Sequence, residues 1–421
     1  MGLIKNMKQD KIKDIIEEFL PVRKIEKDKY GEVFTPLELI EEMLNKLPKN
    51  VWSNPNLKWL DPANGIGNFP MIAYTKLLEG LKEWEPNEDK RSNHIIENML
   101  YMVELNEKNV GVSKKIFGDK SNVYCGDFLE ADLHKIFGID KFDIIMGNPP
   151  FQKKKEGTQT GSRAKNSLWD YFIYKSLEIL NINKYLTFIN PSQWRGLGPE
   201  YHKLWNIMSK KQLLYLHIYG KTSGHKFFNV GSRFDLYVLQ NNDNTQPTEI
   251  IDELEEPHFL NLNEWEFFPN YNYKNIKRIL TTEENGIDVI HSYSKYFTLK
   301  KYINKYKTGE FRYPIIHSIT KNNIGCVYTN DNTKGHFGIP KVILNFNEHQ
   351  YSHPEQNDWE GKYGMSQISF GIPIYSKKEG DLILKAIDTP QFKEIIASTK
   401  WGAFQTDYRM FKYFKKDWYK Y

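Results

Sequence analysis

The sequence Phe142-Asp143-Ile144-Ile145-Met146-Gly147 leads directly into Asn148-Pro149-Pro150-Phe151. The first six residues form a short apolar run that is typical of a strand buried in a sheet. The next four place a carboxamide, two prolines and an aromatic ring at the end of that strand. Proline fixes φ and lacks an N–H, so the prolines stiffen the turn and leave carbonyl oxygens free to accept hydrogen bonds. This combination favours a stiff pocket for a planar amine, and an ordinary turn after a strand is the alternative.

Short apolar runs alternate with helical patterns on both sides of this stretch, from about residue 57 to residue 240. Such alternation predicts βαβ units and a mostly parallel sheet. The expected strands lie at 57–60, 99–104, 122–125, 142–146, 185–189, 213–218 and 233–240. A buried helix is expected over 167–180, and another over 37–47 with Thr35 as its N-cap and Pro36 in its first turn. We therefore predict an α/β fold with a Rossmann-like, seven-stranded sheet.

A polar linker at 241–247 separates this sheet from the rest of the chain. Beyond it, residues 250–421 are rich in Tyr, Asn, Lys and Phe and show no clear βα alternation. This change predicts two domains. The first spans 1–245 and includes a helical extension at 1–33, and the second is a mixed α/β domain over 246–421.

The composition is that of an ordinary globular chain, with 421 residues, of which 40% are hydrophobic and 26% are charged. No apolar run reaches the length of about 18 residues that a transmembrane helix needs, and the N-terminus does not resemble a signal peptide. The two cysteines lie far apart without a CxxC spacing, and the histidines show no paired ligand pattern. These features predict a cytoplasmic protein in a reducing compartment, with no membrane segment, disulfide scaffold or structural metal.

Basic residues gather in two segments, although the net charge of +5 is only a mild excess. The segment 152–167 has one acid and five bases, which are Lys153, Lys154, Lys155, Arg163 and Lys165. The segment 401–421 interleaves bases with aromatic rings. Basic groups neutralise phosphates and rings stack on bases, so both segments are candidates for nucleic-acid contact. The alternatives are solvated lysines in the first segment and a helix docked on the core in the second.

Acidic residues follow the first three expected strands. Asp61 opens the loop 61–69, which contains Gly65 and Gly67, Glu104 closes the second strand, and Asp127-Phe128 follows the third. Glycines allow sharp turns and close approach of a ligand to the backbone. In open α/β sheets, ligands bind at the carboxyl ends of the strands. Each acid alone is equally well explained as a cap of a turn, but the succession favours a nucleotide-like ligand.

These motifs, in the order Phe34-Thr35-Pro36, 61–69, Glu104, Asp127-Phe128 and Asn148 to Phe151, resemble the S-adenosylmethionine-dependent DNA adenine methyltransferases. Their order is that of the gamma class, in which the target-recognition domain follows the catalytic one. The resemblance covers about residues 28 to 240. It implies S-adenosyl-L-methionine as cofactor, double-stranded DNA as substrate, and a C-terminal target-recognition domain. The tetrapeptide is specific for methylation of a planar nitrogen, and does not separate adenine in DNA from other amine or amide substrates.

The resemblance also implies roles for residues around the cofactor. Asp61 would hold the ammonium group, and Glu104 would hold the ribose hydroxyls. Asp127 and Phe128 would surround the cofactor's adenine. The remaining residues would close over the methionine end or pack their backbone against the cofactor; they are Thr35, Pro36, Pro62, Ala63, Asn64, Gly65 and Gly67.

Around the target base, the resemblance implies that Asn148 and the Pro149 carbonyl accept from the amine, Pro150 stiffens the turn, and Phe151 stacks on the ring. A second aromatic residue would cover the other face of the base. Phe228 is the first choice and Phe227 the second, while a role in the core is equally compatible with the sequence. The bases Lys153, Lys154, Lys155 and Arg163 would contact DNA phosphates.

Two alternatives remain open at this point. The same chemistry acts on RNA or on a protein glutamine in related enzymes, and a non-catalytic DNA-binding module belongs to a different class. We find no nuclease motif, so we expect no cleavage by this chain alone, and a separate restriction endonuclease is a candidate partner. The recognition sequence and the oligomeric state are not readable from the sequence.

Overall fold

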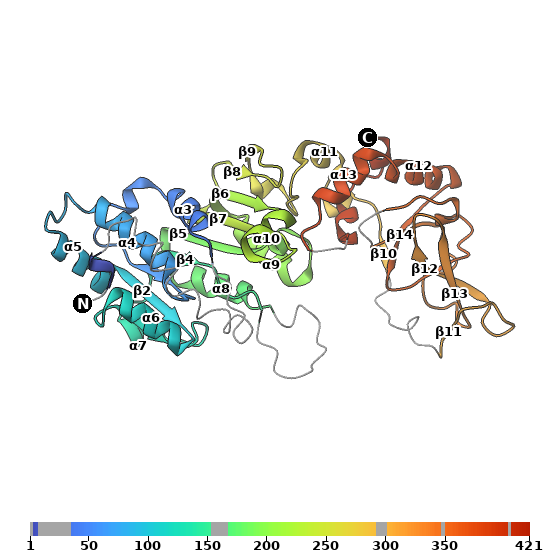
Figure 1. Ribbon diagram of the computed structural model, residues 1–421. Helices are drawn as coiled ribbons and strands as arrows, with labels where there is room; N and C mark the ends of the chain where they lie inside the picture. Colours follow the sequence, from blue (N-terminus) through green and yellow to red (C-terminus); the bar gives the residue numbers. More distant parts are fainter. Residues whose placement is uncertain (1–2, 7–34, 153–166, 292–300, 347–349, 403–405) are drawn as a thin grey trace. The chain divides into compact units, whose positions relative to one another are not determined.

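The computed structural model describes residues 3–6, 35–152, 167–291, 301–346, 350–402 and 406–421. The chain divides into two compact units, coloured along the sequence in Figure 1. The first comprises Met1–Trp194 and Lys203–Trp265, and the second comprises Arg195–His202 and Glu266–Tyr421.

A nine-stranded sheet forms the centre of the first unit, in the order β3-β2-β1-β4-β5-β7-β6-β8-β9. Its strands are β1 (Trp59–Asp61), β2 (Leu100–Glu104), β3 (Asn122–Cys125), β4 (Phe142–Gly147), β5 (Leu180–Pro191), β6 (Lys211–Tyr219), β7 (Phe234–Asp243), β8 (Thr248–Ile251) and β9 (Pro257–Leu260). All seven predicted strands are present. Only β7 among them runs antiparallel to its neighbours. All six residues of β4 are buried, as expected for a central strand with parallel partners and both faces covered.

The sheet continues past the predicted domain boundary at residue 245. The Gln212 side chain accepts hydrogen bonds from the N–H groups of Thr245 and Gln246, at 3.0 and 2.9 Å. These bonds make the polar segment a tight connection between strands instead of a linker between domains. The next strand, β8, pairs in parallel with β6, and β9 pairs with β8. The first unit therefore extends to Trp265.

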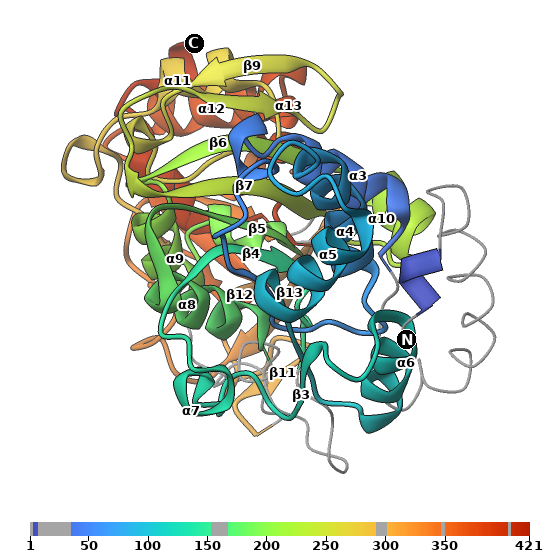
Figure 2. The same ribbon diagram turned by 90° about the vertical axis from the view of Figure 1, so that its left-hand side faces the viewer.

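Helices cover both faces of this sheet, with α3, α4 and α10 on one side and α8 on the other (Figure 2). The helices of this part of the chain are α3 (Leu37–Asn45), α4 (Asn68–Gly80), α5 (Glu88–His94), α6 (Glu107–Phe117), α7 (Leu133–Phe137), α8 (Trp169–Ile179), α9 (Pro199–Met208) and α10 (Lys221–Phe228). The predicted cap of α3 was wrong. The helix begins at Leu37, Pro36 is its N-cap, and no side chain caps it.

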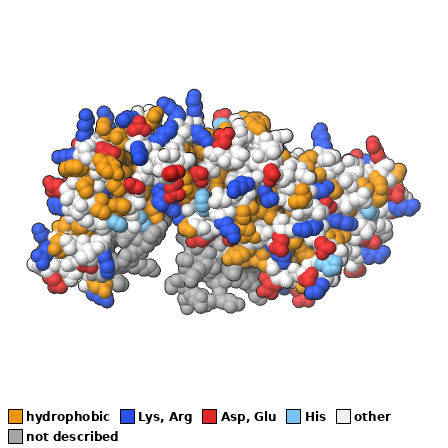
Figure 3. All heavy atoms as spheres, turned by 180° about the vertical axis from the view of Figure 1, so that it is seen from behind, with side chains coloured by type: hydrophobic (Ala, Val, Ile, Leu, Met, Phe, Trp, Pro, Cys, Tyr) orange, Lys and Arg blue, Asp and Glu red, His pale blue; other side chains and the backbone are white. Residues whose placement is uncertain are grey.

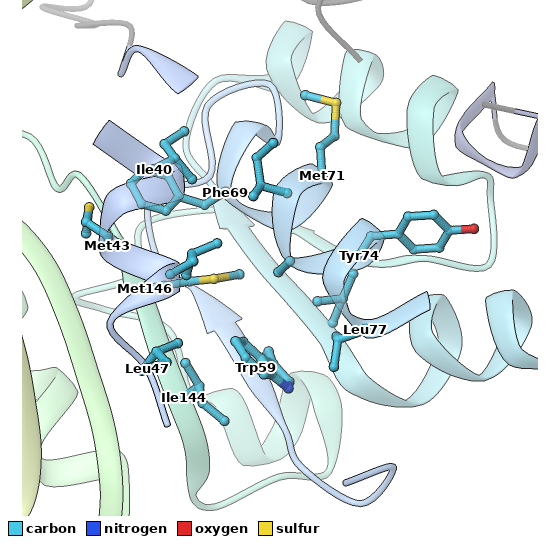
Figure 4. Packing of buried hydrophobic residues seen from close by; sticks show 14 of the residues in the cluster. Ile40, Met43, Leu47, Trp59, Phe69, Met71, Tyr74, Leu77, Ile144 and Met146 are labelled. Atoms are coloured by element: carbon cyan, nitrogen blue, oxygen red, sulfur yellow. The ribbon is translucent and has the colours of Figure 1, made fainter. Parts of the chain in front are cut away.

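The main core lies between α3, α4 and the sheet (Figure 4). In α3 the buried residues are Leu39, Ile40, Met43 and Leu44, which recur at helical spacing. Phe69 and Leu77 of α4 and Met146 of β4 belong to the same cluster. This packing holds the first turns of both helices beside the carboxyl end of β4.

The second unit combines two small sheets with three helices. The sheets have the orders β10-β17-β14-β15 and β11-β13-β12-β16. Their strands are β10 (Ile290–His291), β11 (Ile303–Asn304), β12 (Tyr313–Ile319), β13 (Ile324–Thr329), β14 (Lys341–Asn345), β15 (Asn357–Asp358), β16 (Gly364–Met365) and β17 (Ser369–Pro373). The helices are α11 (Tyr273–Ile279), α12 (Lys377–Ile387) and α13 (Pro390–Ser398).

A short segment of the second unit lies far from the rest of it in sequence. The guanidinium of Arg195 is fully buried, and its Nη1 donates to the carbonyl oxygens of Phe268 and Pro269 at 2.9 and 3.1 Å. Its Nη2 donates to Asn270 Oδ1 at 2.8 Å. Arg195–His202 therefore belongs with Glu266–Tyr421, although the chain returns to the first unit after it.

The C-terminal segment 401–421, in its described residues, forms part of the core of the second unit. It folds into two 3-10 helices, η11 (Tyr408–Tyr413) and η12 (Trp418–Lys420). Phe411, Phe414 and Trp418 are buried, and the Phe411 and Phe414 rings lie 4.8 Å apart. For these three rings the structure confirms the alternative interpretation, in which the segment is docked on the core, because buried rings do not stack on bases. Phe404 lies outside the described residues.

On the face shown in Figure 3, basic and acidic side chains are interspersed and do not form a patch of a single sign. Within the described ranges, no helix has the length and hydropathy that crossing a membrane requires.

Candidate active site

The carboxyl ends of β1, β2 and β4 lie at one edge of the sheet, because β1 pairs in parallel with both other strands. Asp61 ends β1, Glu104 ends β2, and Asn148 follows the last residue of β4. The fold thus brings together three polar residues that are far apart in sequence. This is the edge at which open α/β sheets bind ligands.

Asn148 has one half of its carboxamide engaged and the other half unengaged. Its Nδ2 donates to Thr35 Oγ1 at 3.0 Å. Its Oδ1 is buried and has no hydrogen-bond partner among the described residues. Leaving a buried acceptor unsatisfied costs about 1–3 kcal/mol, so such atoms in folded proteins call for an explanation. An oxygen held in this state is suited to accept a hydrogen bond from a bound amine.

Asp61 is a buried carboxyl group with one unpartnered oxygen. The side chain is 1% exposed, and its Oδ1 accepts from the Ala63 N–H at 3.1 Å. Oδ2 has no partner in the described part of the chain. Burial raises the pKa of Asp61 well above its usual range; the Ala63 N–H opposes this shift, and the nearby charge of Glu104 adds to it. A cation placed beside Oδ2 would reverse this penalty.

Glu104 connects the loops that follow β1 and β2. Its Oε2 accepts from the Gly65 N–H and its Oε1 from the Asn106 N–H, both at 2.7 Å. Glu104 therefore fixes the loops after β1 and β2 relative to each other.

The loop after β1 depends on glycine. The Asn64 N–H donates to the Val103 carbonyl at 3.0 Å, and Asn64 Nδ2 donates to Ser113 Oγ at 2.7 Å. Gly67, the N-cap of α4, has a φ of 97°. A Cβ at Gly67 would lie 2.8 Å from the Phe117 ring. Both the backbone conformation and the space therefore require glycine there.

We expect Gly67→Ala to destabilise the protein by about 1–3 kcal/mol, through backbone strain and the clash with the Phe117 ring. Gly111→Ala is the matched control, since Gly111 lies within α6 and a Cβ there would meet no atom within 4 Å. The control should stabilise the protein by about 0.5–1 kcal/mol. Urea denaturation followed by circular dichroism measures both changes. Equal stabilities of the two variants would contradict the strain argument.

Asp127 and Phe128 occupy different environments. Asp127 is exposed, and its Oδ1 accepts from the Leu129 N–H at 2.8 Å. Phe128 is buried, with its ring 5.2 Å from that of Phe172 on α8 and with Lys175 Nζ 5.0 Å from its centroid. The Phe128 ring therefore packs in the core against α8, and Asp127 is the member of the pair that is accessible to a ligand.

Phe151 directly precedes the basic segment 152–167. Its side chain is partly buried and packs against the main core, and its carbonyl accepts from the Leu168 N–H at 3.3 Å. Gln152 pairs with Ser167 in an antiparallel bridge. The two ends of the segment are thus joined beside the site. Lys153, Lys154, Lys155 and Arg163 themselves lie outside the described residues.

The two phenylalanines at the end of α10 differ in exposure. Phe228, the first choice, is 5% exposed and belongs to the main core, with its ring 4.9 Å from that of Phe234. Phe227 is only partly buried, and its ring meets Tyr219 edge to face at 5.8 Å. Phe227 is therefore the residue with surface available for a ligand.

The sequence reasoning missed a cluster around Glu42 of α3. Glu42 accepts hydrogen bonds from Tyr215 OH at 2.9 Å, from His217 Nδ1 at 2.6 Å, and from Tyr219 OH. Burial alone would raise the pKa of Glu42, but the bonds from His217, Tyr219 and Tyr215 and the charge of His217 lower it overall. The signal in the sequence was the alternation of three polar-tipped rings along one face of β6. The cluster fixes α3, whose first turn adjoins Thr35, against the sheet.

Part of the first unit is similar to a known class of proteins. Residues 71–228 match the family described as Eco57I restriction-modification methylase.

Individual relatives agree with this class. The chain is 27% identical to a protein of Mycoplasma pneumoniae named an uncharacterized adenine-specific methylase, with 39% of this chain and 55% of the relative covered. It is 25% identical to modification methylase CviBIII of Paramecium bursaria Chlorella virus NC1A, with 53% and 52% covered. The chain thus spans about half the length of these relatives. The resemblance predicted from the sequence is confirmed, because the family and both relatives are methylases.

Among solved structures, the chain is similar to the DNA complex of the Type IIL restriction-modification enzyme MmeI. The TM-score is 0.48 and the sequence identity is 13%, with 94% of this chain and 66% of that chain covered.

Proposed function

We propose that the protein is a site-specific DNA methyltransferase that methylates the N6 amine of adenine in double-stranded DNA, with S-adenosyl-L-methionine as cofactor. The observation that carries this proposal is the buried Oδ1 of Asn148 at the carboxyl end of β4, which has no hydrogen-bond partner among the described residues. A carboxamide oxygen beside a proline carbonyl offers two acceptors, which match the two N–H bonds of an aromatic amine. The methylases among the relatives support the same chemistry.

The residues at the sheet edge fit the cofactor. Asp61 Oδ2 is a buried acceptor that has no partner in the part of the chain that the structure describes, which suits an ammonium group. Glu104 would accept from the ribose hydroxyls, and Asp127 would accept from the adenine amine of the cofactor. The backbone from Ala63 to Gly67 would pack against the cofactor, because its glycines allow close approach. When bound, S-adenosylmethionine supplies a methyl group activated by a positively charged sulfur.

The chain's own contribution to the reaction is to orient and polarise the amine. The lone pair of an adenine amine is delocalised into the ring, which makes the nitrogen a poor nucleophile. When Asn148 Oδ1 and the Pro149 carbonyl accept both N–H bonds, the nitrogen becomes more electron-rich. The two oxygens also stabilise the positive charge that develops on the nitrogen, and one such acceptor contributes about 10²–10³-fold in rate. Pro150 keeps the turn stiff.

Access to this pocket requires the base to leave the duplex. Flipping the base out of the duplex costs a few kcal/mol of free energy, and each stacking contact of the base with an aromatic ring stabilises the flipped state by about 1–3 kcal/mol. We propose Phe151 on one face of the base and Phe227 on the other, in preference to the buried Phe228.

A matched pair of variants tests this assignment. We expect Phe227→Ala to lower kcat/KM for DNA by about 10-fold, in line with the loss of one stacking contact, and to cost less stability than Phe228→Ala because the ring is only partly buried. Phe228→Ala should instead cost about 3–5 kcal/mol of stability, because it empties a core position. Steady-state kinetics with urea denaturation separates the two effects. An unchanged kcat/KM in Phe227→Ala would remove that ring from the pocket.

The rest of the proposal concerns partners. The bases Lys153, Lys154, Lys155 and Arg163 would neutralise DNA phosphates, and the second unit would read the target sequence. Cleavage, in a restriction-modification system, would belong to a separate endonuclease. The proposal also places the protein in the cytoplasm, where it would meet its DNA.

A transfer assay with tritium-labelled cofactor tests the function. Duplex DNA, ribosomal RNA and a glutamine-containing protein are offered in parallel, and the labelled DNA is hydrolysed to identify the base. We expect label in DNA as N6-methyladenine. Label confined to RNA or protein would show that the substrate is RNA or protein instead of DNA. The absence of label from all three would reject the proposed methyltransferase activity.

A further inference from the structure

Asn148 Nδ2 donates to Thr35 Oγ1 across 113 residues of sequence. The hydroxyl comes from a residue that is 5% exposed and directly precedes the N-cap of α3. The sequence reasoning gave Thr35 a place beside the cofactor, and the structure shows it bonded to the carboxamide. Each end of this bond is buried or partly buried, so water has little access to replace either partner.

The bond engages one half of the Asn148 carboxamide and fixes the position of the side chain. In the observed orientation, Nδ2 is engaged and Oδ1 is the acceptor without a partner among the described residues. After a half turn the carboxamide oxygen would accept from the same hydroxyl, because a hydroxyl both donates and accepts, but the NH2 group would then face the amine of the substrate. Two donors facing each other cannot form a hydrogen bond, so the observed orientation is the one that suits an amine.

We propose that Thr35 is a positioning residue that holds the Asn148 carboxamide in place beside the target amine. This inference rests on the proposed function and deepens it.

The surroundings of Thr35 support a fixed position for its hydroxyl. Pro36 follows it, and a residue before proline is restricted to extended backbone. The helix behind Pro36 is anchored through Glu42, which accepts from Tyr215, His217 and Tyr219 of β6. Thr35 therefore stands between the stiff turn at Pro149-Pro150 and a helix tied to the sheet, so its hydroxyl has a defined place relative to Asn148.

Two substitutions at Thr35 test the proposal. Thr35→Val keeps the shape and removes the acceptor, and we expect it to lower kcat for methyl transfer by about 10-fold, the effect of one buried hydrogen bond. Thr35→Ser keeps a hydroxyl and should retain kcat within about 2-fold of the wild type. Cofactor affinity, measured by isothermal titration calorimetry, should remain unchanged in both. A kcat of Thr35→Ser as low as that of Thr35→Val would overturn the proposal. If Thr35→Val does not fold, a kcat of Thr35→Ser well below that of the wild type would overturn it.

Thr187→Val is the matched control. Thr187 is a fully buried threonine of β5, and its Oγ1 has no partner among the described residues. The same change there removes no hydrogen bond, so kcat should stay at the wild-type value. A loss of kcat in this control equal to that in Thr35→Val would overturn the proposal, because it would trace the loss to altered packing.

A double-mutant cycle gives the sharpest outcome. If Thr35 acts only through Asn148, Thr35→Val should have no effect on kcat when Asn148 is already alanine. A further loss in the double variant would overturn the proposal, as would a weakened cofactor affinity with unchanged kcat in Thr35→Val, which would assign Thr35 to the cofactor. An inactive wild type would reject the proposed function itself, which distinguishes the two failures.

Discussion

Replacing Asn148 by alanine should lower kcat for methyl transfer by at least about 10²–10³-fold, the effect of removing one preorganised acceptor from a transition state. The variant loses the only buried acceptor that the side chain offers to the amine, and the Pro149 carbonyl remains alone. Cofactor binding should change little, because Asp61 and Glu104 are untouched. Single-turnover kinetics with labelled cofactor measures the rate, and calorimetry measures the affinity.

Two further variants control this result. Asn98→Ala makes the same change near the amino end of β2, where Asn98 is exposed, and kcat should be unaffected. Asn148→Asp keeps an oxygen in the position of Oδ1, and its second oxygen can accept from the Thr35 hydroxyl, so it should retain more activity than the alanine variant. Full activity of Asn148→Ala would exclude the proposed mechanism.

Replacing Asp61 by asparagine should weaken the binding of S-adenosylmethionine by about 10- to 100-fold, the effect of losing a hydrogen bond to a charged group. The carboxylate oxygen Oδ2, which has no partner among the described residues, is the acceptor for the ammonium group in the proposed complex. Calorimetric titration of the two proteins measures the difference.

The same substitution should stabilise the protein in the absence of cofactor. The pKa of Asp61 is raised in the folded state, so the folded protein holds this proton more tightly than the unfolded chain does. Stability is therefore lost as pH rises from the unfolded pKa toward the folded one. Asparagine has no proton to lose, so the advantage of the variant should be absent in acid and grow toward neutral pH. Thermal melts across this pH range measure it.

Asp143→Asn is the control for both effects. Asp143 lies at the amino end of β4, and its carboxylate accepts from the Lys58 N–H at 2.9 Å and from Asn181 Nδ2 at 3.1 Å. These donors within the protein already stabilise the charged carboxylate, so the substitution should destabilise the fold and leave cofactor affinity unchanged. If Asp61→Asn bound the cofactor as tightly as the wild type, Asp61 would have no role at the ammonium group.

Much of the first unit was predictable because its signals are local. The apolar runs located all seven predicted strands, and the parallel pairing then placed Asp61, Glu104 and Asn148 at one edge. These inferences need only the apolar periodicity of each strand and the rule that alternating strands and helices form a mostly parallel sheet.

The features that the sequence did not predict depend on tertiary contacts. The bond between Thr35 and Asn148 joins segments that no local pattern relates. Similarly, the polar residues after β7 have the composition of a linker, and only the distant Gln212 side chain turns them into a connection between strands. In an eight-residue helix such as α10, periodicity cannot separate the two adjacent rings Phe227 and Phe228, because both contact Phe234 and only the tertiary packing buries Phe228 more deeply.

The placement of Arg195 affects how the second unit could be exchanged between relatives. Its guanidinium donates to Phe268, Pro269 and Asn270, although the segment Lys203–Trp265 of the first unit lies between them in sequence. A single genetic crossover after Trp265 would therefore combine one parent's arginine with another parent's acceptors. Functional hybrids should retain Arg195–His202 and the C-terminal region from the same parent, so the two segments are expected to be inherited together.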